Sequence, residues 1–150
     1  MTLSLRPLGI EDMPSATRIH RAAFNANFPW IGALHTPQED LAYWSEHLLT
    51  TCCIWGAEID GRLIGVIAFN DDWVEQLYVD PGFQNAGAGT ALLKIALETS
   101  RSLRLWTFQR NKRARRFYER HGFVAIEMTD GSGNEEREPD ILYRWDRPGR

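Results

Sequence analysis

The spacing of apolar and polar residues along the chain predicts an alternation of helices and strands. In some segments apolar residues recur at the helical period, and in others they alternate with polar residues or form short continuous runs. The segments expected to be helical are residues 11–24, 36–49, 91–100 and 111–121. The segments expected to be strands are residues 3–7, 52–59, 62–69, 73–79, 103–108, 123–128 and 140–145.

Capping and turn residues support these boundaries. Thr36 can cap the second helix while Glu39 closes a capping box. Asp60 and Gly61 are a strong hairpin signal, and Gly122 suits the position after the last helix. The element order is β-α-α-β-β-β-α-β-α-β-β. It predicts a single α/β (α+β) domain, with a mixed central sheet of about seven strands, at least one parallel pair, and about four flanking helices.

Length, charge and cysteine use narrow the class of protein. With 150 residues, 43% hydrophobic and 25% charged, the chain suits one globular domain. Its net charge of −3 argues against a nucleic-acid partner. We see no targeting segment and no apolar run long enough to span a membrane, so we expect a cytoplasmic protein without a membrane partner. Cys52 and Cys53 are adjacent in an expected strand and point to opposite faces, so no disulfide is expected. No metal site is expected either.

The most informative segment is residues 77–90. A predicted strand ends at Val79, a loop containing Gly87 and Gly89 follows, and a helix begins directly afterwards. Small residues let a ligand approach the backbone, and the free N–H groups of a first helical turn bind anions such as a diphosphate. A helix entry without a ligand fits the same residues. The spacing differs from that of the GxxxxGK and GxGxxG phosphate-binding loops.

Two blocks of sequence resemble a known family. Gln84-Asn85-Ala86-Gly87-Ala88-Gly89 resembles the Gln/Arg-x-x-Gly-x-Gly/Ala signature of the GNAT acetyltransferases, which also lies between a strand and a helix. Asn111 with Tyr118 seven residues later, before Gly122 and Phe123, resembles the next motif of that family. The resemblance is close over residues 73–125, and elsewhere it rests on the order of elements.

The resemblance implies an acetyl-CoA-dependent N-acetyltransferase that moves an acetyl group directly onto a primary amine in a ternary complex. The residues that would bind this cosubstrate are Leu77, Tyr78, Val79, Gln84, Asn85, Ala86, Gly87, Ala88, Gly89, Thr90 and Asn111. The backbone of residues 77–79 would hold the pantetheine arm and the thioester oxygen. Tyr118 would protonate the leaving thiolate, although its position on a helical stripe also fits a core residue. Asn111 also fits a helix cap.

Glu75 and the loop of residues 24–35 each have two interpretations. Glu75 lies in the predicted strand on the face of Trp73, Leu77 and Val79, where it could act as the general base or form a surface ion pair. The loop suggests an apolar or aromatic acceptor pocket, or simply core. The residues that carry this suggestion are Phe28, Trp30, Ile31 and His35.

The basic run that begins just before the last predicted helix forms a solvated helix face, or its first members meet the 3′-phosphate of coenzyme A. The residues of this run are Arg110, Lys112, Arg113, Arg115, Arg116 and Arg120. The acceptor is expected to be a small-molecule or peptide amine, and a homodimer stays open. The alternative function is a non-catalytic acyl-CoA-binding sensor on the same fold, against which the presence of Tyr118 and Glu75 argues.

Overall fold

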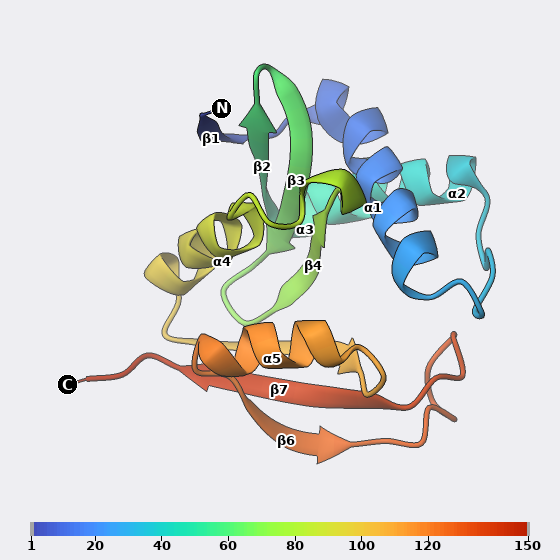
Figure 1. Cartoon of the computed structure of the whole chain (residues 1–150), viewed down its shortest axis with the longest axis vertical. Helices are drawn as coiled ribbons and strands as arrows, with labels where there is room; N and C mark the ends of the chain where they lie inside the picture. Colours follow the sequence, from blue (N-terminus) through green and yellow to red (C-terminus); the bar gives the residue numbers. More distant parts are fainter. Residues whose placement is uncertain (1, 150) are drawn as a thin grey trace.

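The computed structural model describes residues 2–149. Its strands are β1 (Leu3–Pro7), β2 (Cys53–Ile59), β3 (Arg62–Phe69), β4 (Val74–Val79), β5 (Ser102–Phe108), β6 (Val124–Met128) and β7 (Asp140–Asp146). Its helices are α1 (Met13–Asn27), α2 (Pro37–Ala42), α3 (Leu49–Thr51), α4 (Ala88–Thr99) and α5 (Lys112–Arg120), with the π-helical segment η2 (Tyr43–Leu48) and the 3-10 helices η1 (Ile10–Asp12) and η3 (Pro81–Phe83). The predicted order of elements is confirmed, because α2, η2 and α3 together form the expected second helix (Figure 1).

The first sheet is antiparallel and has the strand order β1-β2-β3-β4. Its strand β3 is buried on both faces, which explains the continuous apolar run in its sequence. On one face, α1 and η2 cover β3 with Met13, Ile19 and Trp44. On the other face, α4 covers it with Leu92 and Leu93.

The second sheet has the strand order β5-β7-β6, and α5 lies along it (Figure 1). Leu105 from β5 and Tyr143 from β7 are buried in the same cluster as Leu93 from α4 and Ile67 from β3. One hydrophobic core therefore joins both sheets through α4.

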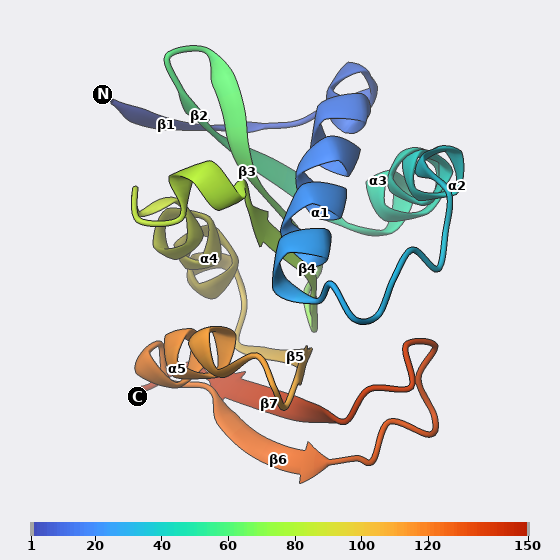
Figure 2. The same cartoon turned by 45° about the vertical axis from the view of Figure 1, so that its right-hand side comes forward.

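The expected mixed sheet is divided between β4 and β5. The two strands meet in a single parallel bridge between Trp73 and Arg104, where the Arg104 N–H donates to Asp72 O at 2.9 Å. Beyond this bridge they diverge (Figure 2). The divergence begins at a bulge: Ala68 pairs with Gln76 and the next residue of β3 pairs with Val74, so β4 has one extra residue. A bulge increases local twist, and this turns β4 away from β5.

The bulge also corrects the predicted face of Glu75, which is the extra residue. Strict alternation would place Glu75 with Leu77 and Val79, but Val74 joins these two residues in the core instead. Glu75 is exposed. The prediction failed because alternation with period two does not continue through a bulge.

The capping and turn predictions are confirmed. Thr36 Oγ1 accepts from the Glu39 N–H at 3.1 Å, and the Thr36 N–H donates to the Glu39 carboxylate at 2.7 Å. Asp60 and Gly61 have φ of +52° and +78°, and Gly122 follows α5 with φ of +92°.

Within residues 2–149, no helix is long and apolar enough to cross a membrane, and no cluster of His, Cys, Asp and Glu could hold a metal ion.

The described backbone path of the loop between β6 and β7 can be tested by substituting its glycines. Gly131 has φ of +86°, and a Cβ there would lie 2.5 Å from the backbone of Glu138. We predict that Gly131→Ala lowers the free energy of unfolding by at least about 1–2 kcal/mol, because both the left-handed conformation and the close contact oppose a side chain. Gly133 is the matched control, since a Cβ there meets nothing within 4 Å.

Urea unfolding measures both variants. Gly133→Ala should change the free energy of unfolding by less than about 0.5 kcal/mol. Equal effects of the two substitutions would contradict the described path of the loop.

Candidate active site

The loop between β4 and α4 leaves the first turn of α4 open. Gly87, at the N-cap, has φ of +83°, which glycine adopts without strain. The first bond of the helix runs from the Ala91 N–H to Gly87 O at 3.1 Å, so the N–H groups of Ala88, Gly89 and Thr90 have no partner inside the helix. A Cβ on Gly87 would meet nothing within 4 Å. Open space, free N–H groups and the helix dipole together suit a bound anion.

The edge of β4 that faces away from β3 is also unpaired. The Asp80 N–H donates to Ile64 O at 2.7 Å, and hydrogen-bonded pairs alternate with non-bonded pairs along an antiparallel ladder. The N–H and C=O groups of Leu77 and Val79 therefore point toward the β5 side. Because β5 has already diverged there, these groups have no strand partner in the described residues.

A cavity of about 380 Å³ lies between this edge, the α4 end and α5; we call it the glycine-loop cavity. Its lining includes nine of the eleven residues expected to bind the cosubstrate: Leu77, Tyr78, Val79, Gln84, Asn85, Gly87, Gly89, Thr90 and Asn111. The other two, Ala86 and Ala88, do not line it. Ala86 is exposed, and Ala88 is buried in the core. Asn111 also caps α5, because its Oδ1 accepts from the Ala114 N–H at 3.2 Å.

Part of the basic face of α5 borders the same cavity. Arg113 donates to Gln84 Oε1 at 2.7 Å and to Asn85 Oδ1 at 3.2 Å, which orders the loop before α4. Arg116 and Arg120 line the cavity as well. The cavity thus combines three guanidinium groups with a helix N-terminus.

Tyr118 lies on α5 where the glycine-loop cavity meets a second cavity. Its ring packs against Phe117 and Phe123, and the residue is only 9% exposed. Within residues 2–149 its hydroxyl has no hydrogen-bond partner. Burial raises the pKa of the Tyr118 phenol above its ordinary value, so the group is protonated at neutral pH and can donate a proton.

The second cavity, the inner cavity, measures about 650 Å³ and lies between β4, β5 and the β6–β7 loop. Its aromatic lining consists of Phe24, Phe28, Tyr78, Trp106, Phe108 and Tyr118. Its acidic lining consists of Glu75, Glu136 and Asp140. Phe28 is buried against Phe24 and Phe108, so it is both core and cavity wall.

The described geometry agrees with a comparison to known families. The model of the Acetyltransferase (GNAT) family matches residues 16–123. The chain belongs to the GNAT acetyltransferase family. The matched part runs from α1 to just beyond α5, and it includes the glycine loop, the edge of β4 and Tyr118.

Individual relatives support the same assignment. The chain is 32% identical over 90 residues to an uncharacterized N-acetyltransferase of Methanocaldococcus jannaschii, covering 49% of this chain and 40% of that protein. It is 30% identical over 91 residues to the uncharacterized N-acetyltransferase YafP of Escherichia coli, covering 61% and 58%. The match thus spans less than two thirds of both curated relatives. Among solved structures, the PaiA N-acetyltransferase of Thermoplasma acidophilum in complex with coenzyme A has a TM-score of 0.76 at 24% identity, covering 97% of this chain and 99% of that one.

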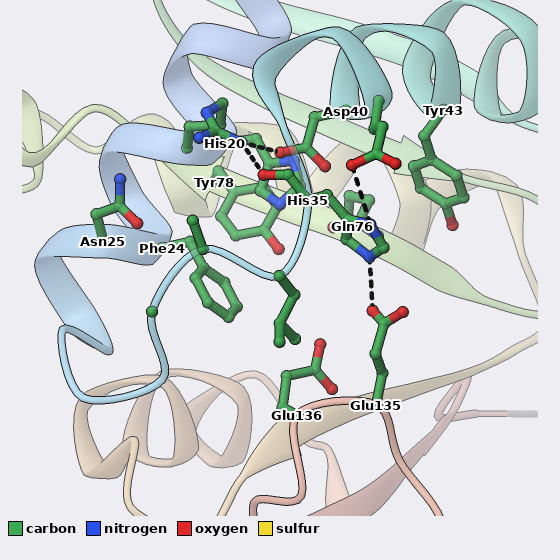
Figure 3. Close-up of a pocket in the computed structure, with 15 residues that line it drawn as sticks. His20, Phe24, Asn25, His35, Asp40, Tyr43, Gln76, Tyr78, Glu135 and Glu136 are labelled. Atoms are coloured by element: carbon green, nitrogen blue, oxygen red, sulfur yellow. Dashed lines mark hydrogen bonds and ion pairs between the residues drawn. The ribbon is translucent and has the colours of Figure 1, made fainter.

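A third cavity of this GNAT chain, the outer cavity, measures about 510 Å³ (Figure 3). It is lined by α1, the α1–α2 loop, α2 and the β6–β7 loop, and it shares Phe24, Gln76, Tyr78 and Glu136 with the inner cavity. His20 stacks on Tyr78 at 4.6 Å and accepts from the Trp44 indole N–H at 3.0 Å. Burial lowers the pKa of His20, so it contributes a neutral ring.

Two contacts tie the α1–α2 loop to the β6–β7 loop. His35 Nε2 lies 2.8 Å from Glu135 Oε1 at the edge of the outer cavity. The Trp30 indole N–H donates to Glu138 Oε1 at 3.0 Å, and the Arg110 guanidinium lies 4.9 Å from the Trp30 ring centre and 3.3 Å from Glu138 Oε2. Trp30 lines none of the three cavities. Its position suggests that it holds the two loops together.

Glu136 and Gln76 are two of the cavity residues that the sequence analysis did not name. Both line the inner and outer cavities. Glu136 lies in an acidic run of the loop between β6 and β7. No local pattern identifies which residue of such a run faces inward, because the loop path depends on contacts with β7 and the α1–α2 loop.

The His35–Glu135 contact gives a pH prediction. The hydrogen bond with Glu135 raises the pKa of His35 above its ordinary value of 6.5. Because the pKa is raised, the stabilisation is fully present at low pH and is lost as the pH rises through the pKa of the folded protein. We predict that an NMR titration gives His35 a pKa above 6.5, and that Glu135→Gln lowers it.

Glu127→Gln is the control for this titration, since Glu127 is exposed on β6 and lines none of the cavities. It should leave the pKa of His35 unchanged. If Glu135→Gln leaves the pKa of His35 unchanged, the two loops are not joined at this contact in solution.

Proposed function

We propose that this protein transfers the acetyl group of acetyl-CoA to a primary amine by direct attack in a ternary complex. The observation that supports this most strongly is the junction of two cavities at one phenol. The glycine-loop cavity and the inner cavity share six lining residues: Asn27, Leu77, Tyr78, Asn111, Ala114 and Tyr118. A donor in the first cavity and an acceptor in the second would meet beside Tyr118.

The residues of the glycine-loop cavity fit coenzyme A. A diphosphate suits the free N–H groups at residues 88–90 and the guanidinium groups of Arg113, Arg116 and Arg120. The pantetheine arm suits the unpaired edge of β4 at Leu77 and Val79. The coenzyme A complex of PaiA, which has the same fold, supports this assignment. When bound, acetyl-CoA supplies the acetyl group as an activated thioester.

The surrounding residues divide the chemistry between them. A backbone N–H from Leu77 or Val79 stabilises negative charge on the thioester oxygen. Tyr118 gives its hydroxyl proton to the leaving sulfur. Glu75 is the proposed base, which takes a proton from the acceptor's ammonium directly or through water.

Direct attack is favoured over an acyl-enzyme route. In the described part of the chain, neither Cys52 nor Cys53 lines any of the three cavities. Burial raises the pKa of the Cys52 thiol, which disfavours the reactive thiolate. We therefore assign no covalent role to the cysteines.

The glycine loop is tested by Gly89→Glu. A Cβ on Gly89 makes only ordinary contacts with Phe117, and a carboxylate in a first helical turn favours the helix, so this variant should fold. The new charge occupies the proposed diphosphate site. We predict at least a hundredfold weaker binding of acetyl-CoA by calorimetry, on the order of 3 kcal/mol.

Gly89→Gln has the same size without the charge and should lose less affinity than Gly89→Glu. Wild-type affinity in a folded Gly89→Glu variant would leave the loop with a structural role only.

Tyr118→Phe tests the acid. The ring and its packing remain, so the free energy of unfolding should change by no more than about 0.5–1.5 kcal/mol. We predict that kcat falls about 10²–10⁴-fold while acetyl-CoA affinity changes little, because the proton is needed only as the carbon–sulfur bond breaks. The loss should be smaller with acyl donors whose thiols are more acidic.

Tyr143→Phe is the matched control. Tyr143 is fully buried, donates to Glu119 and accepts from Arg115, yet it lines none of the cavities. It should cost stability without a comparable loss of kcat. Tight acetyl-CoA binding without turnover on any amine would favour the sensor alternative.

A further inference from the structure

The inner cavity has a charge that its own residues do not balance. No Lys, Arg or His among the described residues lines it. Asp140 accepts hydrogen bonds from Thr129 and Asn134. Glu75 and Glu136 form no hydrogen bond or ion pair within residues 2–149. Two carboxylates therefore face the inner cavity without partners.

The rest of the lining is suited to an organic cation. Aromatic rings attract cations through their faces, and six aromatic side chains surround this cavity. Tyr118, nine-tenths buried and without a hydrogen-bond partner, also lines it. The cavity thus offers Tyr118 and Glu75 to the reacting centre and Glu136 to a second charge of the substrate.

The outer cavity is acidic too, but its charges are largely matched. Arg21 donates to Asp40 at 2.6 Å, and His35 contacts Glu135. Glu39 is used in the capping box of α2. The exception is Glu136, which lies at the junction with the inner cavity and lines both (Figure 3).

We propose that the acceptor is an amine with a second positive charge, which Glu136 binds while the reacting nitrogen lies beside Glu75 and Tyr118. This inference rests on the proposed function. The reacting ammonium gives one proton to Glu75, the nitrogen–carbonyl carbon bond forms, and the carbon–sulfur bond breaks. The leaving sulfur takes the Tyr118 proton, the second proton lost by the acetylated nitrogen restores the Tyr118 phenol, and Glu75 releases its proton to solvent. The second cationic group is unchanged by the reaction.

The test compares three acceptors of similar length that differ in the far end. They are 1,5-diaminopentane, n-hexylamine and 5-aminopentanoate, whose far ends are cationic, neutral and anionic. The diamine should have the highest kcat/KM and the amino acid the lowest. Glu136→Gln should lower kcat/KM for the diamine about tenfold to hundredfold, mainly through KM, and should change hexylamine less than threefold.

Glu127→Gln removes the same charge far from the cavities and should leave all three acceptors unchanged. Equal kcat/KM for the diamine and hexylamine would overturn the inference. Equal losses for both on Glu136→Gln would also overturn it.

Binding without turnover separates this inference from the proposed function. Calorimetry with the full chain saturated by coenzyme A, which has no acetyl group to transfer, measures acceptor binding alone. Tighter binding of the diamine that is lost in Glu136→Gln supports charge recognition, even if no acetyl transfer follows. In that case only the proposed function fails. Equal affinities for acceptors that differ in the far-end charge would overturn the inference, whether or not acetyl transfer occurs.

Discussion

The arrangement of this molecule depends on β4 and β5 pairing at one bridge and nowhere else. A strand edge carries N–H and C=O groups that must find partners, and β4 has such an edge in the middle of the fold rather than at its margin. The groups of Leu77 and Val79 lie next to the inner and glycine-loop cavities, so a ligand can take the place of the missing strand. If β5 had continued the ladder, the sheet would be continuous and there would be no cavity for donor or acceptor.

Helix α4 holds the two sheets together where β4 and β5 diverge. Its Leu92 and Leu93 are buried in the core that spans both sheets, so the molecule is not split where the strands diverge. The same helix presents its unpaired first turn to the glycine-loop cavity. Packing along one face and anion binding at one end are compatible because they use different groups, side chains for the first and backbone N–H groups for the second. A helix can therefore stabilise the fold and bind a cosubstrate at once.

Most of the fold and about half of the site can be predicted from the sequence. Elements with local signals, such as the capping box at Thr36 and the hairpin at Asp60-Gly61, are predictable because their determinants lie within four residues. The glycine loop and Tyr118 are recognisable because they lie in contiguous motifs on well-defined elements. Glu75 was assigned to the wrong face because a bulge is a property of strand pairing, which one strand's sequence does not specify. Glu136 was not predictable because its position depends on a loop path. The contacts of Trp30 with Glu138 and Arg110 were not predictable because they join segments about eighty residues or more apart.

The extra residue in β4 also constrains how this gene can change. Removing Glu75 would close the bulge and leave Val74 on the core side with Leu77 and Val79, but it would also remove the local twist that turns β4 away from β5. A one-residue deletion at the bulge would therefore change the space between β4 and β5 while the core residues of β4 keep their faces.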